Sequence, residues 1–197
     1  MRVMRLLRMA ACAVALVALP AAAIAGPVVT DLAGRAVELP DSVGKVILGE
    51  GRFLPVLAIL ETEDPVARVA GMMADFERLD PDGYALYLER FPALADVPHI
   101  GLTTEDSFSL EEAIALDADV AIFGVEGHGP SARAAETIAT LEAAGVTVVF
   151  VDFRQKPLEN SAPSIALLGK VLGREERADA FLAFYRAGMA RVTERLA

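Results

Sequence analysis

Residues 108–130 read FSLEEAIALDADVAIFGVEGHGP, and this stretch decides the fold class. A short amphipathic segment leads into four consecutive apolar residues, 120–123, which is the pattern of a buried strand. The chain then enters a loop that contains three glycines, and His128 lies between two of them. We expect this loop to leave the end of a central strand.

A second apolar run, residues 146–151, follows after a helical segment of about 132–144. Ser131 stands where a helix N-cap belongs, and Gly145 stands where a C-terminal cap belongs. Strands whose sequences are continuous apolar runs, and which are joined by helices, are typical of a parallel sheet that is covered on both faces.

The same alternation extends to both ends of the chain. Short apolar runs at 46–48 and 68–70 predict two more strands, and residues 28–39 predict a hairpin at the margin of the sheet. A helix is expected over roughly 80–90, and helical spacing of apolar residues predicts one continuous helix over 174–196. The predicted fold class is α/β, a mainly parallel sheet of four or five strands sandwiched by helices and ending in a long helix.

The first 25 residues have the composition of a signal peptide. Three arginines precede an apolar run over residues 9–19, and Ala23-Ile24-Ala25 fits the small-x-small cleavage rule, so cleavage is expected before Gly26. The apolar run is too short to anchor the chain in a bilayer, so no membrane insertion is expected after cleavage. The sequence therefore predicts an exported, periplasmic protein.

The charge and the single cysteine exclude several classes of function. Without the three leader arginines, 15 basic residues face 28 acidic ones, a formal charge of −13, which argues against nucleic acid or an anionic membrane as a partner. Cys12 lies inside the leader, so a disulfide, a zinc thiolate site and a cysteine nucleophile are not expected.

Ligands of parallel α/β sheets bind outside the carboxyl ends of the strands. Arg52, His128, Phe153 and Arg154 each follow a predicted strand on that side, and Tyr84 is added because residues 71–84 also leave a strand end. A guanidinium group matches the oxygens of an anionic ligand, although each arginine taken alone is better explained as a surface residue. His128 has two open interpretations, a ligand contact or a solvent-exposed loop residue.

The spacing of His, Asp and Glu gives no metal-ligand motif, so we expect no cofactor and no protein-held metal. A metal is expected only inside a bound organic ligand.

One enzymatic alternative rests on Gly127-His128-Gly129-Pro130-Ser131-Ala132, which fits the G-x-G-x-x-A pattern of dinucleotide-binding folds. Asp152 lies at the end of the next strand, where such folds keep the acid that binds ribose. This pattern would make the chain a secreted, Rossmann-like oxidoreductase. The export signal and the lack of a catalytic constellation argue against it.

Several segments together resemble a known family, the periplasmic substrate-binding proteins of ABC importers for iron–siderophore, haem and cobalamin. The matching segments are VTDLAGR at 29–35, residues 108–123, VFVD at 149–152, PLEN at 157–160 and LLGK through GREERA at 167–178. The resemblance implies a non-enzymatic protein with two α/β lobes bridged by a long helix. Residues 26–172 then correspond to the N-terminal lobe and 173–197 to the interdomain helix, and the C-terminal lobe is absent from this sequence.

The resemblance also implies a ligand and a partner. The expected ligand is a ferric siderophore or a similar iron chelate, with haem and cobalamin next and oxyanions last. In this family an acidic residue at the start of the helix matching Ser109-Leu110-Glu111 pairs with arginines of the ABC permease. Glu111 fits that position, with Glu112 as the fallback.

Overall fold

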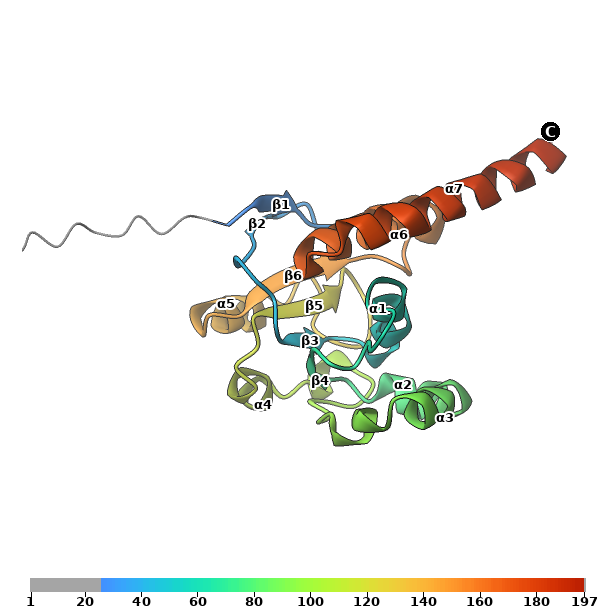
Figure 1. The fold of residues 1–197 in the computed structure, drawn as a ribbon. Helices are drawn as coiled ribbons and strands as arrows, with labels where there is room; N and C mark the ends of the chain where they lie inside the picture. The colour runs from blue at the N-terminus through green and yellow to red at the C-terminus, as the bar shows by residue number, and fades with distance from the viewer. Residues whose placement is uncertain (1–25, 197) are drawn as a thin grey trace, which may run out of the picture.

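The computed structural model describes residues 26–196 (Figure 1). The expected signal peptide, residues 1–25, and its cleavage before Gly26 lie outside the described residues, as does residue 197.

The centre of the molecule is a four-stranded parallel sheet in the order β4-β3-β5-β6 (Figure 1). The strands are β3 (Val46–Leu48), β4 (Val69–Met72), β5 (Val120–Gly124) and β6 (Thr147–Val151). β3 and β5 lie in the middle of the sheet and are buried along their whole length, as their uninterrupted apolar sequences predict. The predicted α/β class and the parallel sheet are therefore confirmed.

β4 ends later than predicted, because the chain stays extended through Gly71 and Met72. Gly71 packs closely inside this strand, since a Cβ atom there would lie 2.5 Å from a Leu116 side-chain carbon. The sequence interpretation had taken the glycine as the end of the strand.

The hairpin of β1 (Val28–Thr30) and β2 (Ala36–Glu38) is antiparallel and forms a separate two-stranded sheet. It lies beside β6, where the Leu32 backbone N–H donates to the Phe150 carbonyl at 3.0 Å. Its turn includes Gly34 at φ +79° and is held by the Asp31 carboxylate, which accepts from the backbone N–H groups of Ala33 and Arg35. The hairpin at the margin is confirmed.

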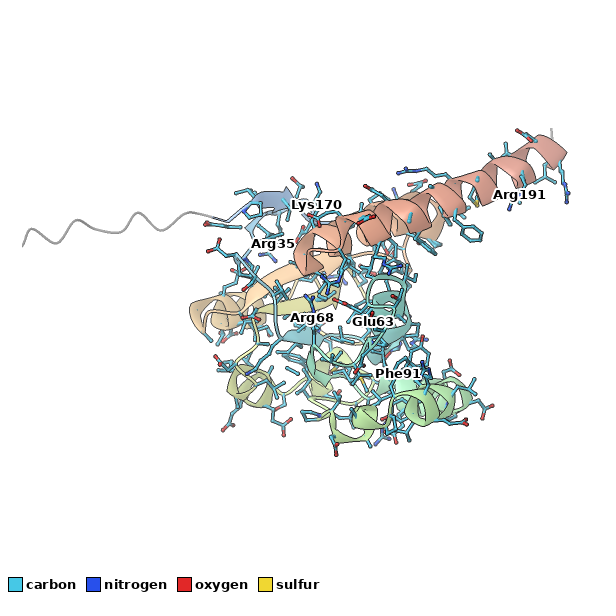
Figure 2. All side chains as sticks on the ribbon, viewed as in Figure 1. Arg35, Glu63, Arg68, Phe91, Lys170 and Arg191 are labelled. Atoms are coloured by element: carbon cyan, nitrogen blue, oxygen red, sulfur yellow. The ribbon has the colours of Figure 1, made fainter. Side chains whose placement is uncertain are left out.

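The long C-terminal helix α7 (Glu175–Leu196) runs without a break through Gly188, as predicted. It begins after Gly173, which ends helix α6 (Pro157–Leu172) in the left-handed conformation at φ +63°. The far part of α7 extends away from the rest of the molecule, and Arg191 lies near that free end (Figure 2). No helix within residues 26–196 is both long and apolar enough to cross a membrane.

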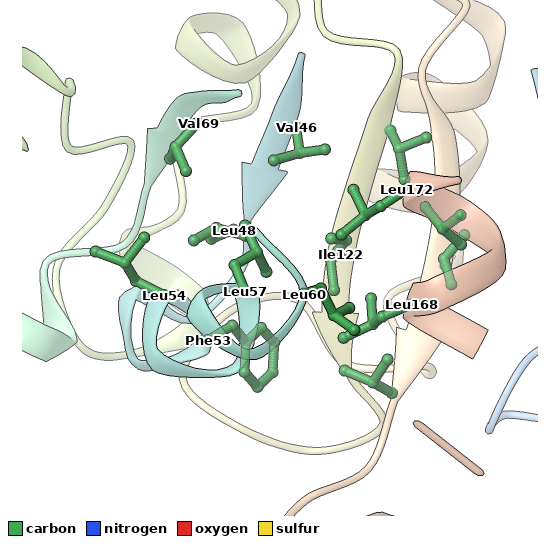
Figure 3. Packing of buried hydrophobic residues seen from close by; sticks show 14 of the residues in the cluster. Val46, Leu48, Phe53, Leu54, Leu57, Leu60, Val69, Ile122, Leu168 and Leu172 are labelled. Carbon is green, nitrogen blue, oxygen red and sulfur yellow. The ribbon is translucent and has the colours of Figure 1, made fainter. Parts of the chain in front are cut away.

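Helices cover both faces of the sheet and form two hydrophobic clusters. On one face, α1 (Leu54–Leu60), α6 and the start of α7 cover the sheet; Leu48, Leu57, Ile122 and Leu168 pack together there (Figure 3). The other cluster includes residues of α4 (Leu110–Ala115) and α5 (Ala135–Ala143). The layers therefore leave the carboxyl ends of the strands free to form a site.

α5 begins three residues later than predicted, and Ser131 is not its N-cap. The Ala132 backbone N–H donates to the Val125 carbonyl at 3.1 Å, which holds the loop against the sheet. Residues 131–134 form a turn instead, and the helix has Ala134 as its N-cap. The C-terminal end is as predicted, with Gly145 at φ +90° and the Val146 N–H bonded to the Leu141 carbonyl.

Residues 73–107 form short elements. The predicted helix over 80–90 is present as α3 (Pro81–Arg90), and Asp80 caps it by accepting from the Gly83 backbone N–H. A five-residue helix, α2 (Asp75–Leu79), precedes it and was not predicted. Two 3-10 turns follow, at Pro92–Asp96 and Glu105–Ser107, and a third precedes α1 at Gly51–Phe53.

Candidate functional site

A cleft of about 300 Å³ lies at the carboxyl ends of β3, β5 and β6. Its apolar part is formed by Val56, Val151 and two aromatic rings, Phe53 and Phe153, which meet edge to face at 5.9 Å between centroids. Its polar part is formed by Glu50, Arg52, Gly124, Glu126 and Arg154. The cleft therefore presents an aromatic surface beside a group of charges.

Two arginines converge on one buried carboxylate at this cleft. The Glu50 side chain is 5% exposed and accepts a 2.7 Å hydrogen bond from Arg154 Nη2, while Arg52 Nη2 lies 3.7 Å from the same oxygen. The side chains of Arg52 and Arg154 are 36% and 45% exposed. Because a guanidinium group has five N–H donors, both arginines keep donors for a ligand.

The glycine at the end of β5 and the two glycines in the loop after it make room for the loop after β3. A Cβ atom at Gly127 would lie 1.8 Å from Glu50 Oε1, and one at Gly124 would lie 2.9 Å from the same atom. At Gly129 a Cβ atom would lie 2.2 Å from the Gly49 carbonyl oxygen. The loop contains glycines because the loop after β3, with its buried carboxylate, occupies the space where side chains would point.

His128 contacts Arg52 and is not among the residues that line the cleft. Its Nδ1 atom lies 2.7 Å from the Thr103 carbonyl oxygen, and its Nε2 atom lies 2.7 Å from Arg52 Nη2. The carbonyl only accepts and the guanidinium only donates, so the ring is neutral with its proton on Nδ1. The half-buried His128 is thus fixed between two partners, and neither of the two interpretations from sequence described this.

Asp75 completes the surroundings of Arg52. Its side chain is fully buried; Oδ2 lies 3.1 Å from Arg52 Nε, and Oδ1 accepts from the Gly51 backbone N–H at 2.6 Å. Oxygen or nitrogen atoms of Glu50, Asp75 and His128 all lie within 4.8 Å of one another, a grouping suited to a metal ion. The expectation of no protein-held metal stays a prediction, and sequence spacing gave no sign of this cluster because its three residues are far apart in the chain.

Four of the five predicted ligand residues meet near this edge. Arg52, Phe153 and Arg154 line the cleft, and His128 touches it through Arg52. Tyr84 does not line the cleft: it is buried on α3 and packs edge to face on Phe76 at 5.6 Å. Burial and the nearby Glu77 carboxylate raise the pKa of Tyr84. Glu50 and Asp75 were missed; Glu50 alone has a local signal, its position between two glycines directly after a buried strand.

The Asp152 carboxylate is used entirely by its own loop. It accepts from the backbone N–H groups of Arg154 and Gln155 at 2.9 and 2.7 Å, and from Asn160 Nδ2 at 2.7 Å. Burial raises its pKa, but these hydrogen bonds outweigh burial and hold the pKa below its usual value of 3.8. Asp152 is thus not free to bind a ribose, and the G-x-G-x-x-A segment does not open a helix.

Glu111 and Glu112 lie in the first turn of α4, both exposed. Ser109 is the N-cap of this helix, as expected, and accepts from the Glu112 backbone N–H at 3.3 Å. The position of Glu111 is thus accessible to a partner.

A cleft at the carboxyl ends of the strands is the usual position of a ligand site in a parallel α/β sheet. No protein-family model and no curated protein sequence matches the chain. Among solved structures, the TroA-like periplasmic binding protein FepB from Veillonella parvula matches with a TM-score of 0.71 and 28% identity, covering 85% of this chain and 48% of its own.

Two further structures show the same fold at lower identity. The periplasmic binding protein MolA of Haemophilus influenzae, bound to molybdate, has a TM-score of 0.68 and 17% identity, with coverage of 86% and 53%. The petrobactin-binding protein YclQ of Bacillus subtilis matches with a TM-score of 0.61 and 20% identity. The match covers 85% of this chain and 52% of YclQ. The chain thus spans about half the length of the structures it matches.

The neighbours thus include the TroA-like FepB, the petrobactin-binding YclQ, the haem-binding HmuT and the molybdate-bound MolA, and this set of periplasmic binding proteins confirms the resemblance seen in the sequence. Such proteins are transport components without enzymatic activity, and the oxidoreductase alternative finds no support.

Proposed function

We propose that this chain is the solute-binding component of an ABC importer in the periplasm. It captures an anionic iron chelate of the ferric siderophore type and delivers it to the permease. Haem and cobalamin rank behind a siderophore. Two neighbours support this class of ligand, the petrobactin-binding protein YclQ and the haem-binding protein HmuT, whereas a third, MolA, is bound to molybdate.

The arrangement of Arg52 and Arg154 beside the Phe53–Phe153 pair carries this proposal. Guanidinium groups bind carboxylate and related oxygens through charge-assisted hydrogen bonds, and the ring faces accept an apolar or aromatic shell. A metal chelate with anionic oxygens and an organic shell offers both surfaces at once.

A cleft of about 300 Å³ is at the small end for a ligand of this size, so this lobe forms one wall of the complete site. We place the other wall on a second α/β lobe that follows α7, in line with the longer neighbours. In this assignment residues 26–172 are the N-terminal lobe and α7 is the interdomain helix.

The assignments of export and of permease docking follow from the same class of binding protein. Residues 1–25 direct export to the periplasm and are removed before Gly26. Glu111, exposed at the start of α4, meets arginines of the permease.

Isothermal titration of the purified protein, alone and joined to a second lobe, tests the proposal. The probes are ferric citrate, a ferric tris-catecholate siderophore, haem and molybdate. We expect an anionic ferric chelate to bind tightest, and Arg52→Gln and Arg154→Gln to weaken it. Arg90→Gln is the matched control, because Arg90 is exposed at the end of α3 and does not line the cleft. Failure of every probe to bind the two-lobed form would contradict the proposal.

A further inference from the structure

Three donor groups surround the guanidinium of Arg52 in the geometry of a cation site. The Glu50 and Asp75 carboxylates and His128 Nε2 lie within 4.8 Å of one another. Ligand atoms of one tetrahedral, zinc-sized ion lie about 3.4 Å apart, so the donors would need to move closer to one another to share an ion. We call Glu50, Asp75 and His128 the acid–histidine cluster.

Contacts outside the acid–histidine cluster hold each donor in place. Asp75 is fixed by the Gly51 backbone N–H and Glu50 by Arg154. His128 donates its Nδ1 proton to the Thr103 carbonyl, so that Nε2, which faces Arg52, is the acceptor atom. A histidine oriented through its other nitrogen by a backbone carbonyl is the usual arrangement at metal sites.

The Arg52 guanidinium supplies the positive charge that the cluster needs. It contacts Asp75 at 3.1 Å and His128 at 2.7 Å, and it lies 3.7 Å from Glu50. Two buried carboxylates require compensating charge, and Arg52 with Arg154 balances them one for one. Since arginine stays protonated at every physiological pH, this cation is permanent, and a metal ion would have to displace it.

We infer that Arg52 determines the charge specificity of the cleft by filling the acid–histidine cluster and so excluding free divalent cations. A metal then enters the cleft only inside an anionic chelate, which meets the outward donors of the two arginines. The exclusion of free cations stands on the cluster alone, whereas its consequence for the chelate rests on the proposed function.

The test uses Co²⁺ alone, followed by its visible absorption and by isothermal titration at pH 7.5. Arg52→Ala removes the cation and leaves space among the three donors, so it should bind Co²⁺ at least about tenfold more tightly than the unaltered protein. Co²⁺ should also raise the melting temperature of this variant. Arg52→Lys is the matched control, because its ammonium still supplies a positive charge to the cluster, and it should gain no Co²⁺ binding.

The double variant Arg52→Ala/His128→Ala should lose the gained affinity, which assigns the binding to this cluster. The inference is overturned if Arg52→Ala binds Co²⁺ no better than the unaltered protein, or if the double variant binds as well as the single one. Should Arg52→Ala fold poorly, Arg52→Gln, which is also uncharged, carries the same comparison. Because no chelate is used, this result is independent of whether the ferric probes bind.

Discussion

Arg154 Nη2 donates a 2.7 Å hydrogen bond to the buried carboxylate of Glu50, and the two residues follow different strands, β6 and β3. The bond therefore ties together two loops that are 104 residues apart in the chain. The glycines after β5 allow this contact, because they leave the space that the Glu50 side chain fills.

Gly127→Ala should therefore destabilise the protein by about 1–3 kcal/mol, the usual cost of forcing extra volume into a packed site. The new methyl group would collide with Glu50 Oε1. The cost should be much smaller in a Glu50→Ala background. Urea unfolding of the unaltered protein, the two single variants and the double variant measures the difference. Equal costs in both backgrounds would contradict the packing of the loop on Glu50.

Gly188→Ala in α7 is the matched control for that substitution. A Cβ atom at Gly188 meets only the end of the Arg191 side chain, at 3.8 Å, and the position is inside a helix. Alanine should stabilise the protein by about 0.5–1 kcal/mol, because glycine loses more backbone freedom on folding. A loss of stability in the same urea experiment would speak against a continuous helix.

Asp152 should make stability depend on acid pH. Its pKa is lower in the folded protein than its usual 3.8, so the ionised carboxylate stabilises the fold above that value. This contribution is lost as the pH falls from 3.8 through the lower folded pKa. Asp152→Asn should cost about 1–3 kcal/mol at pH 7 and progressively less in acid, measured by urea unfolding at several pH values. Asp41→Asn, at an exposed position, should show no such trend.

His128 should influence ligand binding through Arg52. We expect His128→Ala to weaken binding of a ferric chelate roughly three- to tenfold. The reason is that less well oriented Arg52 donors cost about 1 kcal/mol of binding free energy. In an Arg52→Gln background the same substitution should have little further effect. Isothermal titration of the single and double variants decides this, and an equal loss in both backgrounds would indicate direct contact between His128 and the ligand.

Reversing the charge of Glu111 should separate docking from folding. Glu111→Arg, in a two-lobed form, should leave chelate affinity unchanged and cost at most about 1 kcal/mol of stability through the helix dipole. Uptake in a reconstituted transporter should fall, because like charges would face each other at the permease. Glu176→Arg is the control, since Glu176 is also exposed in a first helical turn. Normal uptake with Glu111→Arg would leave this residue with a structural role only.

The elements that sequence predicted well are those whose signal is long or repeated. β5 and β6 are uninterrupted apolar runs, and α7 keeps one apolar spacing over 22 residues. α2 is only five residues long, too short for a periodic pattern. Ser131 has the residue type of an N-cap, but a backbone bond of its neighbour Ala132 to Val125 overrides that preference.

Only part of the candidate site could be predicted from the sequence, and the reason is different. The edge of the sheet could be predicted, because topology alone places Arg52 and Arg154 there. Glu50 and Asp75 are acids, which usually lie on the surface, and their burial depends on partners supplied by other loops. Such a partnership leaves no local pattern in the sequence.

Because α7 is held at its first turns, a small rotation there produces a larger displacement at its far end. Arg174 at its start pairs with Glu61 at the end of α1, and Arg68 donates to the Leu172 carbonyl just before it. Ala178 and Leu182 are buried and hold the first turns of α7, and residues 183–196 span about 21 Å, so a tilt of about 5° of that part displaces the far end by about 2 Å. A small change in the contacts of Glu61, Arg68 and Arg174 thereby displaces the far end of α7, and any group attached there, by roughly the diameter of an atom.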